Sequence, residues 1–147
     1  MSNRRIILLV EDNPDDTELF RLAFSRSGTF GELRAVGDGQ EALGYLAGEG
    51  VYADRDQFPR PHLMLLDLRM PHVGGFEILK NIRSLPEFKG LPVITFSGSE
   101  YHPDVRRAYE LGANCFLKKP TSFDELVQTL KELCGFWLSR CELPETS

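Results

Sequence analysis

Hydrophobic residues in this chain gather in short continuous runs that alternate with longer amphipathic stretches. Apolar runs of about 4–8 residues, bounded by polar residues, are typical of strands buried on both faces of a parallel sheet. The runs at 33–36 and 114–117 are short, so they are better candidates for edge strands. In chain order, the predicted strands cover residues 5–10, 33–36, 62–66, 92–96 and 114–117.

The stretches between these runs carry signals for the start of a helix. Asn13 precedes Pro14, and an Asn side chain caps free backbone N–H groups while proline fits the first helical position. Asp38 and Ser122 each lie three residues before a Glu, a spacing that predicts a capping box. We therefore expect helices that begin near residues 14, 39, 76, 103 and 123.

Strands that alternate with helices predict an α/β fold, in which a doubly wound parallel sheet is covered by helices on both faces. Two segments interrupt the alternation: 47–61 is a long polar connection and 139–147 is a polar tail. A chain of 147 residues is long enough for one domain with its own core. We expect one domain over residues 1–138, followed by the tail and by no output domain.

Composition narrows the functional classes. Hydrophobic residues make up 41% of the chain and charged residues 27%, which is ordinary for a globular protein. The net charge of −5 argues against nucleic acid or an anionic membrane surface as partner, because binding to either begins with a basic patch. No apolar run approaches the roughly 20 residues that span a bilayer, and three scattered cysteines favour a reducing compartment. We therefore expect a cytoplasmic protein.

Polar residues follow the ends of four predicted strands. Glu11 and Asp12 follow the first strand, Asp67 the third, Ser97 the fourth and Lys119 the fifth. In an open parallel sheet, ligands bind where the carboxyl ends of the strands meet. The sequence therefore predicts that three carboxylates, a hydroxyl and an ammonium group converge on one edge of the sheet.

Such a cluster needs counter-charge, because carboxylates a few ångströms apart repel and raise the pKa of at least one of them. A hard divalent cation such as Mg²⁺ favours carboxylate and phosphate oxygens, and Lys119 supplies a point charge. A carboxylate in this setting can act as a nucleophile toward a phosphoryl group. The residue types thus point to metal-assisted phosphoryl chemistry. Asp15 and Asp16 are interpreted as acids that favour the helix dipole and not as site residues.

Several motifs, each near the end of a predicted strand, resemble the receiver domain of bacterial two-component response regulators. The resemblance covers residues 4–138 and implies a flavodoxin-like sheet of five strands in the order 2-1-3-4-5. The motifs are LLVED at 8–12, LLDLRMP at 65–71, GG at 74–75, VITFSG at 93–98, GA at 112–113 and KP at 119–120.

The resemblance implies a role for the acidic residues in a phosphorelay. Asp67 would accept a phosphoryl group from a phosphohistidine of a partner sensor histidine kinase, which would make the chain a phosphoprotein. Glu11, Asp12 and Asp67, together with the backbone carbonyl of Arg69, would bind Mg²⁺ or Mn²⁺. The chain would not be an enzyme, beyond catalysing its own phosphorylation and dephosphorylation.

The resemblance also implies a conformational switch. Ser97 and Lys119 would bind the phosphoryl oxygens, and Ser97 would move toward them. Phe116 stands at the aromatic switch position and would turn into the space that Ser97 leaves. The peptide bond that precedes Pro120 would be cis.

The connection at 47–61 resembles that of single-domain regulators that serve bacteriophytochrome histidine kinases, and those regulators tend to be homodimers. Phe136, Trp137 and Leu138 are candidates for a dimer interface, since three consecutive bulky apolar residues cannot all face one core. Output would then be a protein–protein contact with a downstream protein, or dimerisation.

Two other functions compete with this one. A pseudo-receiver would keep the fold as a phosphorylation-independent interaction module, but such modules usually lose part of the acid, hydroxyl and lysine set. A flavin carrier on the same scaffold would need a phosphate-binding loop after the first strand. The acidic segment 11–16 has the opposite charge.

Overall fold

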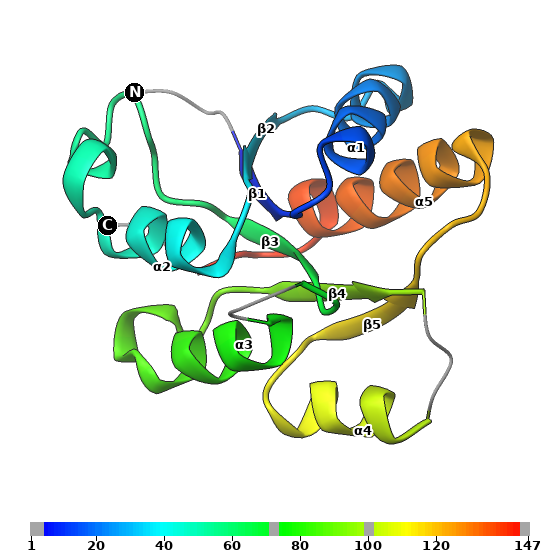
Figure 1. Cartoon of the computed structure of the whole chain (residues 1–147). Coiled ribbons are helices and arrows are strands. Elements are labelled where there is room, and N and C mark those ends of the chain that lie inside the picture. Colours follow the sequence, from blue (N-terminus) through cyan, green and yellow to red (C-terminus); the bar gives the residue numbers. More distant parts are fainter. Residues whose placement is uncertain (1–4, 71–73, 99–101, 145–147) are drawn as a thin grey trace.

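The computed structural model describes residues 5–70, 74–98 and 102–144, so the ends of the chain and Pro71 of the 65–71 motif lie outside the described residues. The strands form one parallel sheet in the order β2-β1-β3-β4-β5, which confirms the predicted order (Figure 1). Each observed boundary lies within one residue of its prediction. The strands are β1 (Ile6–Val10), β2 (Glu32–Val36), β3 (Leu63–Asp67), β4 (Val93–Ser97) and β5 (Cys115–Lys118).

Helices cover both faces of the sheet, as the alternating pattern predicts. Helices α1 and α5 lie on one face, and α2, α3 and α4 lie on the other (Figure 1). In β1, Ile7 and Leu9 pack toward α1 and α5, whereas Leu8 and Val10 pack toward α2 and α3. The continuous apolar run therefore supplies two cores at once. The helices are α1 (Pro14–Ser27), α2 (Gly39–Ala47), α3 (Gly75–Ser84), α4 (His102–Glu110) and α5 (Phe123–Gly135).

The predicted caps position the helices above the strand ends. The Asn13 side chain accepts hydrogen bonds from two backbone N–H groups in the first turn of α1. Asp38 accepts from the N–H of Glu41 at 2.8 Å, but the Glu41 carboxylate accepts from Gly37 and not from Asp38. Ser122 likewise caps α5. The N-cap half of each predicted capping box is therefore present, and the return contact of Glu41 is made one residue earlier, at Gly37.

Aromatic residues hold the connection at 47–61 in place by packing against one another. The polar composition of the segment does not predict this packing. It contains a 3₁₀ helix, Gly50–Ala53. The ring of Tyr52 lies 5.1 Å from the rings of both Tyr45 and Phe58. Arg55 donates to carbonyls at the carboxyl end of α2 at 2.7 and 2.8 Å. The segment thus supplies hydrogen-bond donors to the last carbonyls of α2 and covers the core on the α2 and α3 side of the sheet.

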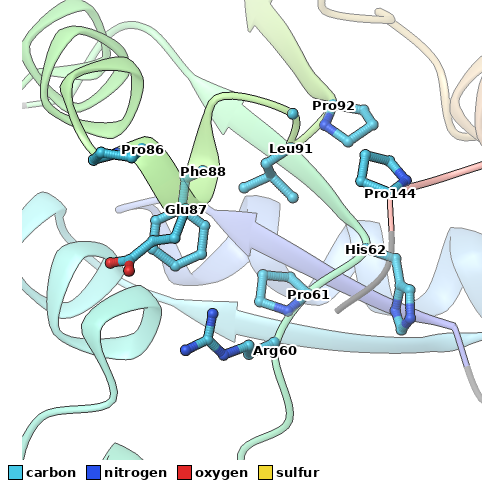
Figure 2. Close-up of a pocket in the computed structure, with 10 residues that line it drawn as sticks. Arg60, Pro61, His62, Pro86, Glu87, Phe88, Leu91, Pro92 and Pro144 are labelled. Carbon is cyan, nitrogen blue, oxygen red and sulfur yellow. The ribbon is translucent and has the colours of Figure 1, made fainter. Parts of the chain in front are cut away.

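The last helix extends beyond the predicted end of the domain at residue 138. A π-helical turn, Phe136–Arg140, follows α5 and closes with a 3.0 Å hydrogen bond from the N–H of Cys141 to the carbonyl of Phe136. Leu143 then packs against the core beside α1 and α5. Pro144 lines a cavity of about 320 Å³ at the amino ends of β3 and β4 (Figure 2). The first part of the predicted tail therefore belongs to the fold.

Leu138 is not available as an interface residue, so that part of the predicted dimer surface is wrong. Its side chain is 6% exposed and packs in the core with Leu130 and Cys134. Positions four residues apart share one face of a helix, which places Leu138 on the buried stripe of α5. Phe136 is 55% exposed.

Within the described residues, no helix is long and apolar enough to cross a lipid bilayer.

Candidate functional site

The carboxyl ends of the strands bring the predicted polar residues to one open cavity of about 590 Å³. Glu11 directly follows β1, Asp67 ends β3, and Lys119 follows β5. Ser97 ends β4 and is 1% exposed, but Gly98 and not Ser97 lines the cavity. The sheet therefore builds the site as the sequence predicts, with Ser97 as a buried neighbour. The cavity is lined by Glu11, Asp12, Asn13, Asp16, Asp67, Arg69, Gly98 and Lys119.

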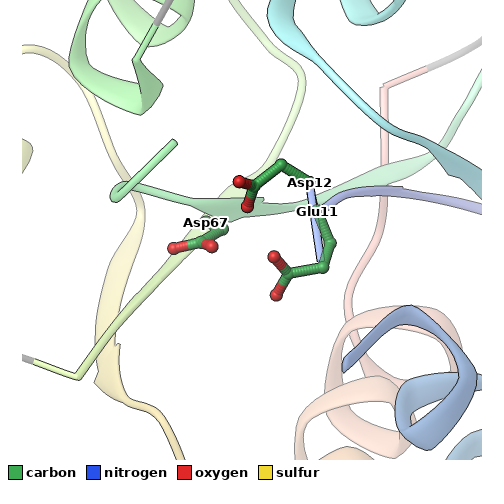
Figure 3. A group of neighbouring side chains, drawn as sticks. All are labelled: Glu11, Asp12 and Asp67. Atoms are coloured by element: carbon green, nitrogen blue, oxygen red, sulfur yellow. The ribbon is translucent and has the colours of Figure 1, made fainter. Parts of the chain in front are cut away.

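Three carboxylates meet between the ends of β1 and β3 (Figure 3). One oxygen from each of Glu11, Asp12 and Asp67 lies within 4.8 Å of the others. Glu11 and Asp67 are 2% and 4% exposed, and the backbone N–H of Asn13 donates to the Glu11 carboxylate at 3.3 Å. These all-oxygen donors suit a hard divalent cation.

The side chain of Lys119 forms ion pairs with several acids of the site. Its Nζ lies 2.8 Å from Glu11 Oε1, 3.3 Å from Asp67 Oδ2 and 3.3 Å from Asp16 Oδ2. Its backbone N–H donates to the carbonyl of Ser97 at 2.8 Å, which holds the residue at the strand end. The prediction that Asp16 is only a helix-dipole residue was therefore wrong, because its carboxylate also contacts the site lysine.

The electrostatics of the cluster leave an excess of negative charge. Burial raises the pKa of Glu11, and the hydrogen bond and charge of Asp67 raise it further, against an opposing effect of Lys119. Burial and the neighbouring Glu11 raise the pKa of Asp12. Burial disfavours the charged form of Lys119, but its hydrogen bond with Glu11 and the charges of Asp67, Glu11 and Asp16 raise the pKa of the ammonium group. One lysine is thus shared by several acids, and a divalent cation would relieve the remaining repulsion.

Asp67 is held in place by the backbone that follows it. The N–H of Arg69 donates to Asp67 Oδ1 at 3.0 Å. A Cβ on Gly75, at the start of α3, would lie 2.5 Å from the carbonyl oxygen of Asp67 and from Cα of Leu68. Glycine is therefore required for α3 to begin so close to the strand end. The Arg69 side chain forms an ion pair with Asp104 of α4, a partner that the sequence did not indicate.

Two expectations concern β5 and the residues that follow it, namely the position of Phe116 and the isomer of the peptide bond before Pro120. Phe116 is partly buried against the core beneath α4, and its N–H donates to the hydroxyl of Tyr109 at 3.1 Å. The described peptide bonds include no cis bond, so the cis bond predicted before Pro120 is wrong for this structure. Trans is the favoured isomer of an X–Pro bond by about 0.5–1 kcal/mol, and nothing in the Lys-Pro pair itself overrides that preference.

Comparisons with known proteins cover nearly the whole chain. The family described as response regulator receiver domain matches residues 7–131, a range that contains the residues of the cavity. Response regulator Rcp1 of Synechocystis sp. is 36% identical over 140 residues, which is 95% of this chain and 93% of that protein.

Two solved structures extend the likeness to the fold. The phosphorylated cyanobacterial phytochrome response regulator RcpA is 39% identical, with a TM-score of 0.87 over 97% of this chain and 99% of that one. The Mn²⁺-bound form of response regulator Rcp1 is 35% identical, with a TM-score of 0.83 over 96% of this chain and 99% of that one.

Proposed function

The chain belongs to the response regulator receiver domain family, and from that premise we propose that Asp67 is the residue on which it carries its phosphoryl group. A response regulator of this family is a signalling protein that acts through phosphorylation, and not an enzyme in the ordinary sense. The observation that carries the assignment is the placement of Asp67. Its carboxylate ends the central strand β3, and Lys119 and the N–H of Arg69 contact it.

We propose that Glu11, Asp12 and Asp67, with the carbonyl of Arg69, hold Mg²⁺ or Mn²⁺. The raised pKa values of Glu11 and Asp12 and the surplus of acids over Lys119 support this assignment. The Mn²⁺-bound form of the relative Rcp1 supports it as well. A bound divalent ion would neutralise charge on the oxygens of the transferred group.

The phosphoryl step follows from the positions of the side chains. An oxygen of the Asp67 carboxylate forms the new P–O bond while the P–N bond of a phosphohistidine breaks. The electron pair of that bond returns to the imidazole nitrogen, which takes up a proton. Lys119, kept charged by its raised pKa, donates hydrogen bonds to the phosphoryl oxygens. Ser97 would reach the same oxygens by a shift from the end of β4, and Phe116 would fill the space behind it.

The partner that supplies the phosphoryl group is a sensor histidine kinase. We propose that this kinase is of the bacteriophytochrome type, because the relative RcpA is a phytochrome response regulator. We also propose that the transfer takes place in the cytoplasm. The 47–61 connection, closed by Tyr52 and Phe58, is compatible with this subgroup. The chain would also catalyse its own phosphorylation and dephosphorylation.

The proposed function predicts uptake of a phosphoryl group from a small donor. Incubation with an acyl phosphate and Mg²⁺ should add the mass of one phosphoryl group, measured on the intact protein, and a chelator should prevent the addition. The metal is required because the acids near Asp67 would otherwise repel the donor. Uptake that is insensitive to the chelator would contradict the metal site. No uptake from acyl phosphate or from a histidine kinase would contradict the function.

We also propose that the chain forms a homodimer through Phe136 and Trp137, whose rings lie edge to face at 5.9 Å. Removal of an aromatic anchor from an interface typically costs about 2 kcal/mol or more, so Phe136→Ser should weaken the dimer at least about thirtyfold. Sedimentation over a range of concentrations measures this. Phe30→Ser, which removes another exposed ring, is the control and should leave the dimer unchanged. A wild type that is monomeric at every concentration would contradict the proposal.

A further inference from the structure

Helix α4 is attached to its neighbours largely by polar and aromatic side chains. Of its described side chains, Ala108 alone is fully buried. A helix with so little buried apolar surface depends on its other contacts for its position. Three such contacts reach different elements: Asp104 with Arg69 before α3, Arg107 over the ring of Phe76 at 4.3 Å, and the Tyr109 hydroxyl with the N–H of Phe116.

The first of these contacts begins at the proposed phosphorylation site. Arg69 donates its backbone N–H to Asp67 Oδ1, and Arg69 also lines the cavity that contains Asp67 and Lys119. Its guanidinium group pairs with Asp104 in the first turn of α4. The Asp104 side chain is 16% exposed and that of Arg69 is 61% exposed, so the acid is the sheltered partner and the arginine has room to move.

A phosphoryl group on Asp67 would compete for this arginine. The phosphoryl group carries about 1.5 to 2 negative charges on three strong acceptor oxygens, and it replaces the single charge of the carboxylate at the point where Arg69 is already anchored. A planar guanidinium can form two parallel hydrogen bonds to a phosphate, which makes it a strong partner. Lys119 is already shared among Glu11, Asp16 and Asp67. Arg69 is thus a second cation at the cavity, and in the structure its side chain forms an ion pair with Asp104 of α4.

We propose that the Arg69–Asp104 ion pair is a latch that holds α4 in the unphosphorylated protein, and that Arg69 exchanges Asp104 for the phosphoryl group on Asp67. This proposal rests on the proposed function, because it needs Asp67 to be the phosphoacceptor. Asp104 is then a positioning residue. It touches neither donor nor metal, and it acts by keeping Arg69 and the first turn of α4 together.

Hydrogen exchange of the α4 amides tests the latch, with beryllium fluoride and Mg²⁺ as a stable mimic of the phosphoryl group. A partly covered ion pair stabilises a structure only modestly, so the mimic should speed exchange in the first turns of α4 by about two- to fivefold in the wild type. Asp104→Asn should raise exchange by a similar factor without the mimic and should show little further response to it. Asp104→Glu, which keeps the charge, should behave as the wild type.

Two controls separate the latch from a simple effect on helix stability. Glu110→Gln removes the same charge from the same helix, and Glu110 lies at its other end. It should behave as the wild type. In an Arg69→Met background, Asp104→Asn should have no additional effect, because the partner is already absent. An equal effect in that background would show that Asp104 acts through the helix dipole alone, and it would overturn the latch.

The outcomes distinguish this proposal from the proposed function. Uptake of beryllium fluoride without a change in α4 exchange would overturn the latch and leave phosphorylation of Asp67 intact. A wild type that takes up neither beryllium fluoride nor phosphoryl groups would overturn both. Loss of the response in Asp104→Asn, with the response kept in Glu110→Gln, supports the exchange of partners by Arg69.

Discussion

Replacement of Asp67 with asparagine is expected to reduce phosphorylation by acyl phosphate to background. The amide has no charged oxygen that could attack phosphorus, so the nucleophile is lost. The amide oxygen can still accept the 3.0 Å hydrogen bond from the N–H of Arg69, and the side chain keeps its size. The substitution removes one negative charge from a crowded acidic cluster. The free energy of unfolding of the variant should therefore lie within about 0.5 kcal/mol of the wild-type value or exceed it. Intact mass and thermal unfolding measure the two effects.

Two further variants separate the nucleophile from its surroundings. Lys119→Gln keeps the Asp67 carboxylate but removes its cation, and loss of one such stabilising group costs about 10²–10³ in rate. Asp15→Asn removes an exposed acid near the start of α1 that does not line the cavity, and it should leave the rate unchanged. Labelling of Asp67→Asn at the wild-type rate would move the nucleophile to Glu11 or Asp12. A wild type that is never labelled would favour the pseudo-receiver, a phosphorylation-independent interaction module.

The parts of the site that lie next to strand ends were predictable from the sequence. Glu11, Asp67 and Lys119 each lie at the end of an apolar run, and parallel pairing brings those ends together. The residues that were missed reach the site from helices. Asp16 contacts Lys119 across 103 positions of the chain, and Asp104 contacts Arg69 across 35. Their roles depend on how a helix lies over the sheet, which the local pattern does not specify.

Irregular segments account for most of the other differences. The aromatic cluster of Tyr45, Tyr52 and Phe58 orders a connection whose spacing has neither helical nor strand periodicity. Leu138 is a different case. Its distance of four and eight positions from Cys134 and Leu130 was visible in the sequence, and it already placed the side chain on the buried face of α5.

Replacement of Arg83 with glutamine is expected to lower the free energy of unfolding by about 2–4 kcal/mol. Arg83 lies near the end of α3 and is partly buried, and burial lowers the pKa of its guanidinium group. Each carbonyl that loses a donor in a partly buried place costs about 1–3 kcal/mol, and water recovers part of this. Chemical denaturation measures the loss. The acceptors are the carbonyls of Phe88, Lys89, Leu91 and Gly112 and Oδ1 of Asn114, at 2.7–3.2 Å.

These bonds join α3 to the loops that enter β4 and β5, at the end of the sheet opposite the acidic cavity. Arg83→Lys should recover little of the stability, because an ammonium group cannot reproduce the planar fork of donors. Arg106→Gln removes an exposed arginine of α4 and should change stability by less than about 0.5 kcal/mol. A fully stable Arg83→Lys would show that charge and not geometry matters at this position. Where Arg83→Gln remains folded, its phosphorylation rate should match the wild type, because the strand ends that hold Asp67 and Lys119 are untouched. A slower rate would mean that the two ends of the sheet are coupled.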